Sequence, residues 1–145
     1  MRPIMEDKVG IPIIYICSPY RPTSEDEKAR GIELEANVKR ACDACRLLVT
    51  MGYMPLAAHL YFPRFLDDDD PKERKEGMSL GMEWLEYASE LWVFGNIISE
   101  GMAEEIAFAK RMGIPVRCMA EPGEVVQMLL DALEKKASGK ADTEL

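Results

Sequence analysis

The sequence predicts an α/β fold in which a parallel β-sheet lies between two layers of helices. Short apolar, β-branched runs alternate four times with longer segments whose apolar residues recur every three or four positions. Such alternation favours parallel strands joined by right-handed helical crossovers. The 145 residues, 48% of them hydrophobic, suit one core. We therefore expect a Rossmann-like or flavodoxin-like three-layer sandwich with a parallel sheet of four to five strands.

The first half of the chain carries two predicted strands and two predicted helices. Gly52 follows the first helical pattern, as glycine often does at a helix C-terminus. Asp70 and Pro71 have the residue types of an N-cap and a first helical position, and they open the second helical pattern. The predicted elements are a strand at 11–17, a helix at 28–51, a strand at 53–58 and a helix at 71–88.

The second half of the chain repeats this alternation. Ser99 is a typical N-cap residue and precedes the next helical pattern. The predicted elements are a strand at 90–94, a helix at 100–112, a strand at 114–119 and a helix at 123–136. Because no internal repeat or linker interrupts the pattern, residues 1–145 are predicted to form a single domain with a core at 11–136 and a polar tail at 137–145.

Composition limits the partners and the location of the protein. The formal net charge of -8 argues against binding of a nucleic-acid polymer, because phosphate backbones need a basic face. A small phosphorylated ligand needs only one or two local donors. No apolar run reaches membrane-spanning length, and the N-terminal MRPIMEDKVG lacks the apolar region of a signal peptide. We therefore expect a cytoplasmic protein without a membrane partner, and its four cysteines as free thiols.

The loops after the first three strands are the expected ligand site, because ligands of open parallel sheets bind at the carboxyl ends of the strands. The loop after the third strand leads into a helix at Ser99, whose first backbone N–H groups are unpaired and attract anions. Gly101 lets a ligand approach the backbone closely. The alternative interpretation is an ordinary capped helix, which is common in proteins.

Helical geometry distinguishes two adjacent glutamates in this segment. At about 100° per residue, Glu105 lies within the apolar face of the helix and Glu104 on the far side. A carboxylate that points inward needs compensation, since burial of an unpaired charge is costly. The nearby helix N-terminus supplies part of it. Glu105 is therefore either a nucleophile or base at a ligand site, or a structural carboxylate paired with a neighbour.

Other candidate site residues follow the first two strands. Tyr15 lies in the first strand, and the loop after it carries Ser18 and Arg21. Arg21 can bind a phosphate through two hydrogen bonds, although a surface arginine is the commoner case. His59, the only histidine, comes directly after the second strand and is either a ligand-site residue or a packing residue.

The sequence predicts neither a metal site nor a cofactor. Cys42 and Cys45 form a CxxC motif, but it lies within a helical pattern and no second ligand pair has matching spacing. The acidic run Asp67–Asp70 is better explained as a solvated loop that ends in a helix cap.

Three segments carry a resemblance to a known family: IYICSPYRP (14–22), MEWLEYASELWVFG (82–95) and SEGMAEEIAFAKRMGIPV (99–116). Together they resemble the nucleoside 2-deoxyribosyltransferase superfamily, which includes nucleoside 5′-monophosphate N-glycosidases. The similarity is greatest to a branch found in phages and bacteria with HLYFPRFLDDDDP after the second strand. It covers about residues 11–119, and the order and spacing of the motifs carry it, since no single motif is highly specific.

The resemblance implies cleavage or transfer of the N-glycosidic bond of nucleosides or nucleoside 5′-monophosphates. On the matching motif Glu105 is the nucleophile that forms a covalent glycosyl intermediate, and Tyr15 lies near the sugar. Arg21 and Ser99 match positions that hold the 5′-phosphate, and His59 matches a histidine near the base or sugar. Relatives are dimers or larger, so the resemblance also implies a homo-oligomer.

One position departs from the family pattern. The resemblance places Ser89 where the family has an aspartate that binds a sugar hydroxyl and assists the leaving base. Glu90 is adjacent, but neighbouring strand residues point to opposite faces. Glu83, Glu86 or the acidic run 67–70 are the alternatives for this role. The serine therefore favours a second hypothesis, a non-catalytic nucleotide-binding module of the same fold.

Overall fold

The computed structural model of the protein describes residues 10–119 and 121–138 and shows an α/β fold with a four-stranded parallel sheet. The strands lie in the order β2-β1-β3-β4. This architecture confirms the predicted fold class, with four strands as the lower of the two expected numbers. The strands are β1 (Ile13–Cys17), β2 (Met54–Leu56), β3 (Glu90–Val93) and β4 (Val116–Cys118).

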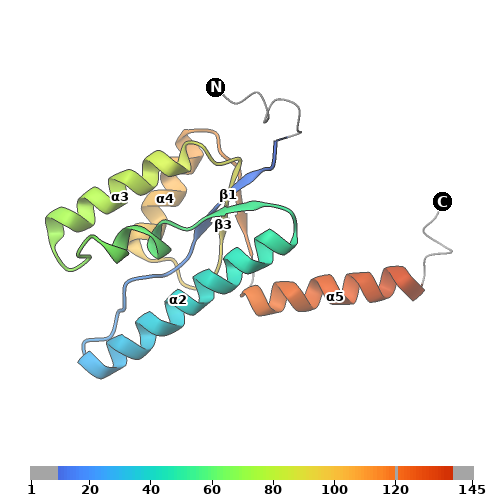
Figure 1. Cartoon of the computed structure of the whole chain (residues 1–145), viewed down its shortest axis with the longest axis horizontal. Helices are drawn as coiled ribbons and strands as arrows, with labels where there is room; N and C mark the ends of the chain where they lie inside the picture. The colour runs from blue at the N-terminus through green and yellow to red at the C-terminus, as the bar shows by residue number, and fades with distance from the viewer. Residues whose placement is uncertain (1–9, 120, 139–145) are drawn as a thin grey trace.

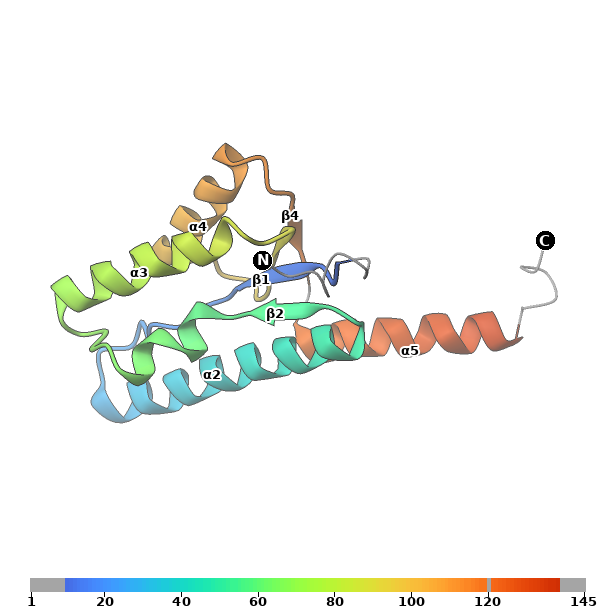
Figure 2. The same cartoon turned by 45° about the horizontal axis from the view of Figure 1, so that its top comes forward.

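Helices cover both faces of this sheet (Figures 1 and 2). On one face α3 packs beside α4, and on the other α5 starts against α2 and extends beyond the sheet. None of the helices described at 10–119 and 121–138 is long and apolar enough to cross a membrane. The helices are α2 (Glu27–Thr50), α3 (Pro71–Leu85), α4 (Glu100–Arg111) and α5 (Pro122–Ser138), and two 3-10 turns are η1 (Ala58–Leu60) and η2 (Phe62–Arg64).

Side chains alternate across the two faces of β1, as the two-residue period of a strand requires. Tyr15 and Cys17 belong to the core beneath α3 and α4, whereas Ile14 and Ile16 belong to the core beneath α2. All four side chains are buried. A strand covered on both faces has no polar side, which explains why its sequence is a continuous apolar run.

The predicted caps fix where two helices begin. Asp70 precedes Pro71 and accepts a hydrogen bond from the backbone N–H of Lys72. Ser99 accepts from the backbone N–H of Met102 at 3.3 Å. Both caps were predicted from the sequence and are confirmed. The start of α4, which carries the candidate nucleophile, is therefore set by local sequence.

Element ends differ from prediction by a few residues. The helix predicted to reach residue 88 ends at Leu85, because the chain must turn to bring Ser89 N–H to the carbonyl of Ile13 at 2.7 Å. The second strand is shorter than predicted, because Ala58 already belongs to a 3-10 turn. The last helix continues to Ser138, beyond the predicted start of the tail, and residues 139–145 lie outside the described part of the chain.

The strand order changes direction at β1. From β1 the chain passes to β2 on one side, and it then returns past β1 to form β3 on the other side. The loops after β1 and β3 therefore leave the same edge of the sheet in different directions. Such a change in strand order opens a crevice at the carboxyl ends of the strands, where ligands bind in folds of this class.

Candidate active site

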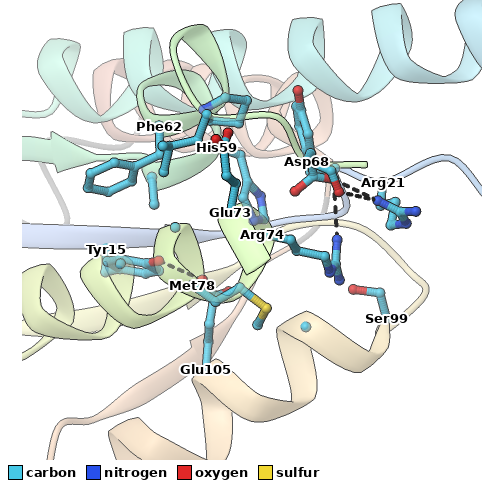
Figure 3. A pocket seen from close by; sticks show the side chains of 17 residues that line it. Tyr15, Arg21, His59, Phe62, Asp68, Glu73, Arg74, Met78, Ser99 and Glu105 are labelled. Carbon is cyan, nitrogen blue, oxygen red and sulfur yellow. Dashed lines mark hydrogen bonds and ion pairs between the residues drawn. The ribbon is translucent and has the colours of Figure 1, made fainter. Parts of the chain in front are cut away.

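A pocket lies at this edge, between the carboxyl end of β1, the two 3-10 turns, α3 and the start of α4 (Figure 3). The structure brings six of the eight residues proposed from the sequence into its lining, although they come from three separate segments of the chain. These six are Tyr15, Arg21, His59, Ser99, Gly101 and Glu105.

Glu105 projects from α4 into the interior beside the pocket. Its side chain is 6% exposed, whereas Glu104 is exposed, as helical geometry predicts. The hydroxyl of Tyr15 donates a hydrogen bond to Oε2 at 2.5 Å. Oε1 is buried and has no hydrogen-bond partner in the part of the chain that the structure describes. One oxygen of this carboxyl group is therefore held in place, and the other can accept a hydrogen bond.

Burial controls the ionisation of the Tyr15–Glu105 pair. It raises the pKa of Glu105 to about 7, and the hydrogen bond from Tyr15 opposes that rise. Burial also raises the pKa of Tyr15 well above its usual value, so this phenol remains a neutral donor. Burial of a carboxyl group lowers the stability of the fold. Carboxyl groups with perturbed pKa values are therefore found mainly at functional sites, where their chemistry is needed.

A group of charges closes the pocket on the side away from Tyr15. Asp68 accepts from Arg21 at 3.0 Å and from Arg74 at 3.2 Å, so that one carboxylate joins two guanidinium groups. Arg21 also donates to the backbone carbonyl of Asp68 at 2.8 Å. The acidic run after β2 is thus more than a solvated loop with a cap, because Asp68 lines the pocket.

His59 lines the pocket next to the ring of Tyr20. The two ring centroids are 5.0 Å apart, with the planes tilted by 32°. Burial lowers the pKa of His59 to about 4, so its imidazole is neutral at neutral pH. A neutral imidazole can donate or accept a hydrogen bond to a ligand but supplies no proton as an imidazolium.

The start of α4 forms another part of the lining through Ser99 and Gly101. The Ser99 hydroxyl caps the helix and also faces the pocket (Figure 3). The cap interpretation and the ligand interpretation of Ser99 are therefore compatible, since a hydroxyl has both a donor and acceptor lone pairs.

Comparison with known protein families assigns the chain to a family. A family described as a domain of unknown function, DUF7768, matches residues 12–119. The chain belongs to this family. No significant match was found among curated proteins.

A solved structure of a 2-deoxyribosyltransferase from Bacillus psychrosaccharolyticus is similar to this DUF7768 domain, with a TM-score of 0.55 and 17% sequence identity. The similarity covers 74% of this chain and 72% of that chain. At this sequence identity the similarity shows a shared fold. This is also the fold that the sequence resemblance implies.

Two proposed substrate-binding residues of the DUF7768 domain lie outside the pocket lining. The Ser18 side chain is buried at 2% exposure and is not part of the lining. Ser89 is exposed and precedes β3, so it lies at the amino edge of the sheet, opposite the pocket. Glu90 accepts hydrogen bonds from Trp92 and Arg117 and is likewise outside the lining.

The position of α3 that faces Tyr15 is a glycine. A Cβ atom on Gly81 would lie 3.2 Å from the Tyr15 hydroxyl oxygen and 3.3 Å from Cβ of Ala58. At this position α3 therefore supplies no carboxylate opposite Glu105, and the α3 carboxylate in the lining is Glu73, in the first turn of the helix. The alternatives Glu83 and Glu86 are exposed and outside the lining.

Several lining residues were missed by sequence reasoning. Arg74, Met78 and Gly81 recur at the spacing of one helical face. This spacing identifies them as lining residues only when the orientation of α3 is known. Tyr20 and Asp68 lie in loops, where no periodicity identifies the inward side, and the acidic run 67–70 was named only as one of three alternative sources of an acid. At 10–119 and 121–138, no three histidine, cysteine, aspartate or glutamate side chains are arranged to hold a metal ion.

Proposed function

We propose that this protein cleaves or transfers the N-glycosidic bond of nucleosides or nucleoside 5′-monophosphates, with Glu105 as the nucleophile. The observation that carries the proposal is the carboxyl group itself: it is buried, one oxygen is fixed by Tyr15, and the other is without a partner beside a pocket. The fold shared with a 2-deoxyribosyltransferase and the sequence resemblance to that superfamily support it.

The proposed reaction has two displacements at the anomeric carbon. Oε1 of Glu105 attacks C1′, and the C1′–N bond breaks as the base leaves with the bonding electrons and takes a proton from water. A water molecule, or a nitrogen of an acceptor base, then attacks C1′. The C1′–Oε1 bond breaks, its electrons return to the carboxylate, and the proton of the incoming nucleophile is released to solvent.

The other lining residues have positioning roles in this proposal. Tyr15 holds Oε2, which leaves Oε1 as the attacking atom. His59 and the ring of Tyr20 form an apolar and hydrogen-bonding surface suited to a base or sugar. Arg21 and Ser99 are placed to bind the 5′-phosphate when one is present.

Release of free base tests the proposal. Wild-type protein is incubated with a panel of ribo- and deoxyribonucleosides and their 5′-monophosphates, and free base is measured by chromatography. Glu105→Gln is expected to reduce the rate by more than about a thousandfold, because it removes the nucleophile. Glu104→Gln is the matched control, since this neighbouring glutamate is exposed, and it should retain the rate within about twofold. Absence of base release from every substrate would refute the proposal.

A second candidate function is nucleotide binding without turnover. It is favoured by Gly81, which leaves the site without a carboxylate opposite Glu105 on α3. The other acids in the lining are already engaged, since Asp68 pairs with two arginines and Glu73 accepts from the backbone of Asp67 at 2.6 Å. This function predicts ligand-dependent thermal stabilisation with no base released.

A further inference from the structure

Asp68 occupies the place between two cations where an anionic ligand would be expected. It lies 3.0 Å from Arg21 and 3.2 Å from Arg74, and these ion pairs are partly exposed, with 28% of the Asp68 side chain accessible. Partly exposed ion pairs contribute little to stability, so they can be exchanged for another anion at small cost. Exchange of Asp68 for another anion bears on the class of substrate, and this step rests on the proposed function.

Arg74 lies over the first turn of α4. Its Nη2 atom is 4.0 Å from the position that a Cβ on Gly101 would occupy, and its guanidinium lies between Asp68 and Ser99 (Figure 3). The N-terminus of a helix carries a partial positive charge, so a guanidinium beside it is repelled unless an anion lies nearby. Asp68 supplies that anion from one side only.

An independent observation indicates that a ligand belongs in this pocket. Oε1 of Glu105 is buried without a partner among the described residues, and Glu105 lines the same pocket as Arg74 and Ser99. Buried polar atoms in folded proteins are nearly always hydrogen-bonded, and the exceptions call for an explanation. A sugar that reaches Glu105 from a phosphate held near Arg74 would account for both features.

The size of the pocket indicates that Asp68 must move to admit such a ligand. The cavity beside Glu105 measures about 50 Å³, which is room for only a few water molecules. A neighbouring hollow of about 330 Å³ lies beyond it. Arg21 and Asp68 line both cavities, together with Tyr20, Pro63 and Leu66, so this ion pair belongs to the wall between them. Separation of the pair would remove one polar part of that wall.

We infer that Asp68 is a specificity-determining residue that holds Arg21 and Arg74 until the phosphate of a nucleoside 5′-monophosphate displaces it. A phosphate monoester carries up to two charges and three acceptor oxygens, so it binds two guanidinium groups more strongly than one carboxylate does. Arg21 keeps its bond to the Asp68 backbone carbonyl when the carboxylate leaves. A neutral nucleoside lacks the group that displaces Asp68, so the site selects the phosphorylated substrate.

Calorimetric titration of paired ligands tests this inference. The four 2′-deoxynucleoside 5′-monophosphates and the matching nucleosides are titrated into protein carrying Glu105→Gln, so that no substrate is consumed. Adding Asp68→Asn removes the competing charge and should tighten monophosphate binding about tenfold, or about 1.4 kcal/mol, and change nucleoside binding by less than about twofold. Arg74→Gln should abolish the preference for the monophosphate.

Asp69 provides a matched control. It is 79% exposed and lies 3.6 Å from Arg21, so Asp69→Asn removes the same charge next to the site and should alter the affinity by less than about twofold. Melting curves check that each variant is folded, and Asp68→Ser repeats the comparison with a smaller side chain.

Three results would overturn the inference: weaker monophosphate binding in Asp68→Asn, equal tightening of both ligand types, or no monophosphate binding in any variant. These results are separate from a failure of the proposed function. Lack of base release by the wild type would remove the reaction, while the contrast between Asp68→Asn and Asp69→Asn would still decide the role of Asp68.

Discussion

The carboxyl group of Glu105 is subject to opposing influences. Burial and the charge of Glu104 favour the neutral acid, and interactions with Tyr15 and the Cys17 thiol favour the carboxylate; burial is the largest effect and brings the pKa to about 7. Near neutral pH a large fraction of the molecules therefore carries a protonated Glu105. A protonated carboxyl is a poor nucleophile, so the proposed activity is controlled by this single equilibrium.

The dependence of activity on pH follows from this pKa. Below about pH 7 the specificity constant kcat/KM should fall about tenfold per pH unit, and above it the value should level off, because the carboxylate is the reactive form. Tyr15→Phe removes a bond that lowers the pKa, so its profile should shift to higher pH. Initial rates from about pH 5 to 9 measure both. A profile that is flat across this range would contradict the assigned nucleophile.

Single residues differ in how far the sequence predicts them. Glu105 could be distinguished from Glu104 because helical periodicity fixes which side faces the core. The sequence offered the acidic run 67–70 as one alternative pocket acid but could not single out Asp68 or its arginine partners, since these contacts depend on the path of an irregular loop. Ser89 lies outside the pocket because it precedes β3 and so stands at the amino edge of the sheet, as the predicted strand at 90–94 already implied although the motif resemblance suggested a site role.

At the scale of elements, the close approach of α3 to β1 shapes the pocket. Gly81 permits this approach, because a larger residue would meet the Tyr15 hydroxyl and Ala58. The helix therefore has a glycine at a buried interior position, where alanine would be favoured by about 1 kcal/mol of helix propensity. Positioning of Tyr15 and intrinsic helix stability are in conflict at this residue.

Gly81→Ala separates these two effects. The added methyl must displace the Tyr15 hydroxyl by a few tenths of an ångström, so the rate of base release should fall by about tenfold or more, with little change in melting temperature. Gly31→Ala in α2 is the control, because nothing lies within 4 Å of its Cβ position. It should raise stability by up to about 1 kcal/mol and leave the rate unchanged. Equal rates in the two variants would show that Tyr15 is not critical.

The types and order of the elements could be predicted because the alternation of apolar runs and helical patterns is strong. Their ends were less predictable. The apolar run continues past Leu56 through two alanines, yet the chain turns at Ala58 into η1, which packs against α3 and α2. Such contacts between distant segments are absent from local sequence patterns.

For the whole molecule, the buried carboxyl group links folding to pH. The pKa of Glu105 is raised from 4.5 to about 7 in the folded protein. Between these values the folded state retains a proton that the unfolded state has lost. Stability therefore falls as the pH rises through this window, which is the direction expected for a carboxyl group whose pKa is raised by folding.

Glu105→Gln should remove this loss of stability. The amide that replaces the carboxyl group has no charge at any pH, so the variant should be more stable than the wild type at pH 8 by roughly 2–3 kcal/mol and closely similar to it near pH 4.5. Urea unfolding at several pH values measures the difference. A difference that does not change with pH would indicate that the carboxylate is compensated in the folded state.

The hydrogen bond between Tyr15 and Glu105 joins residues 90 positions apart. During synthesis, β1 is made long before α4, and the aromatic hydroxyl is without its acid until that helix has emerged from the ribosome and docked. A nascent chain that has reached only β3 thus lacks the reactive group altogether. Gain of the proposed activity would then report completion of the fold, and base release would serve as an assay for refolding yield.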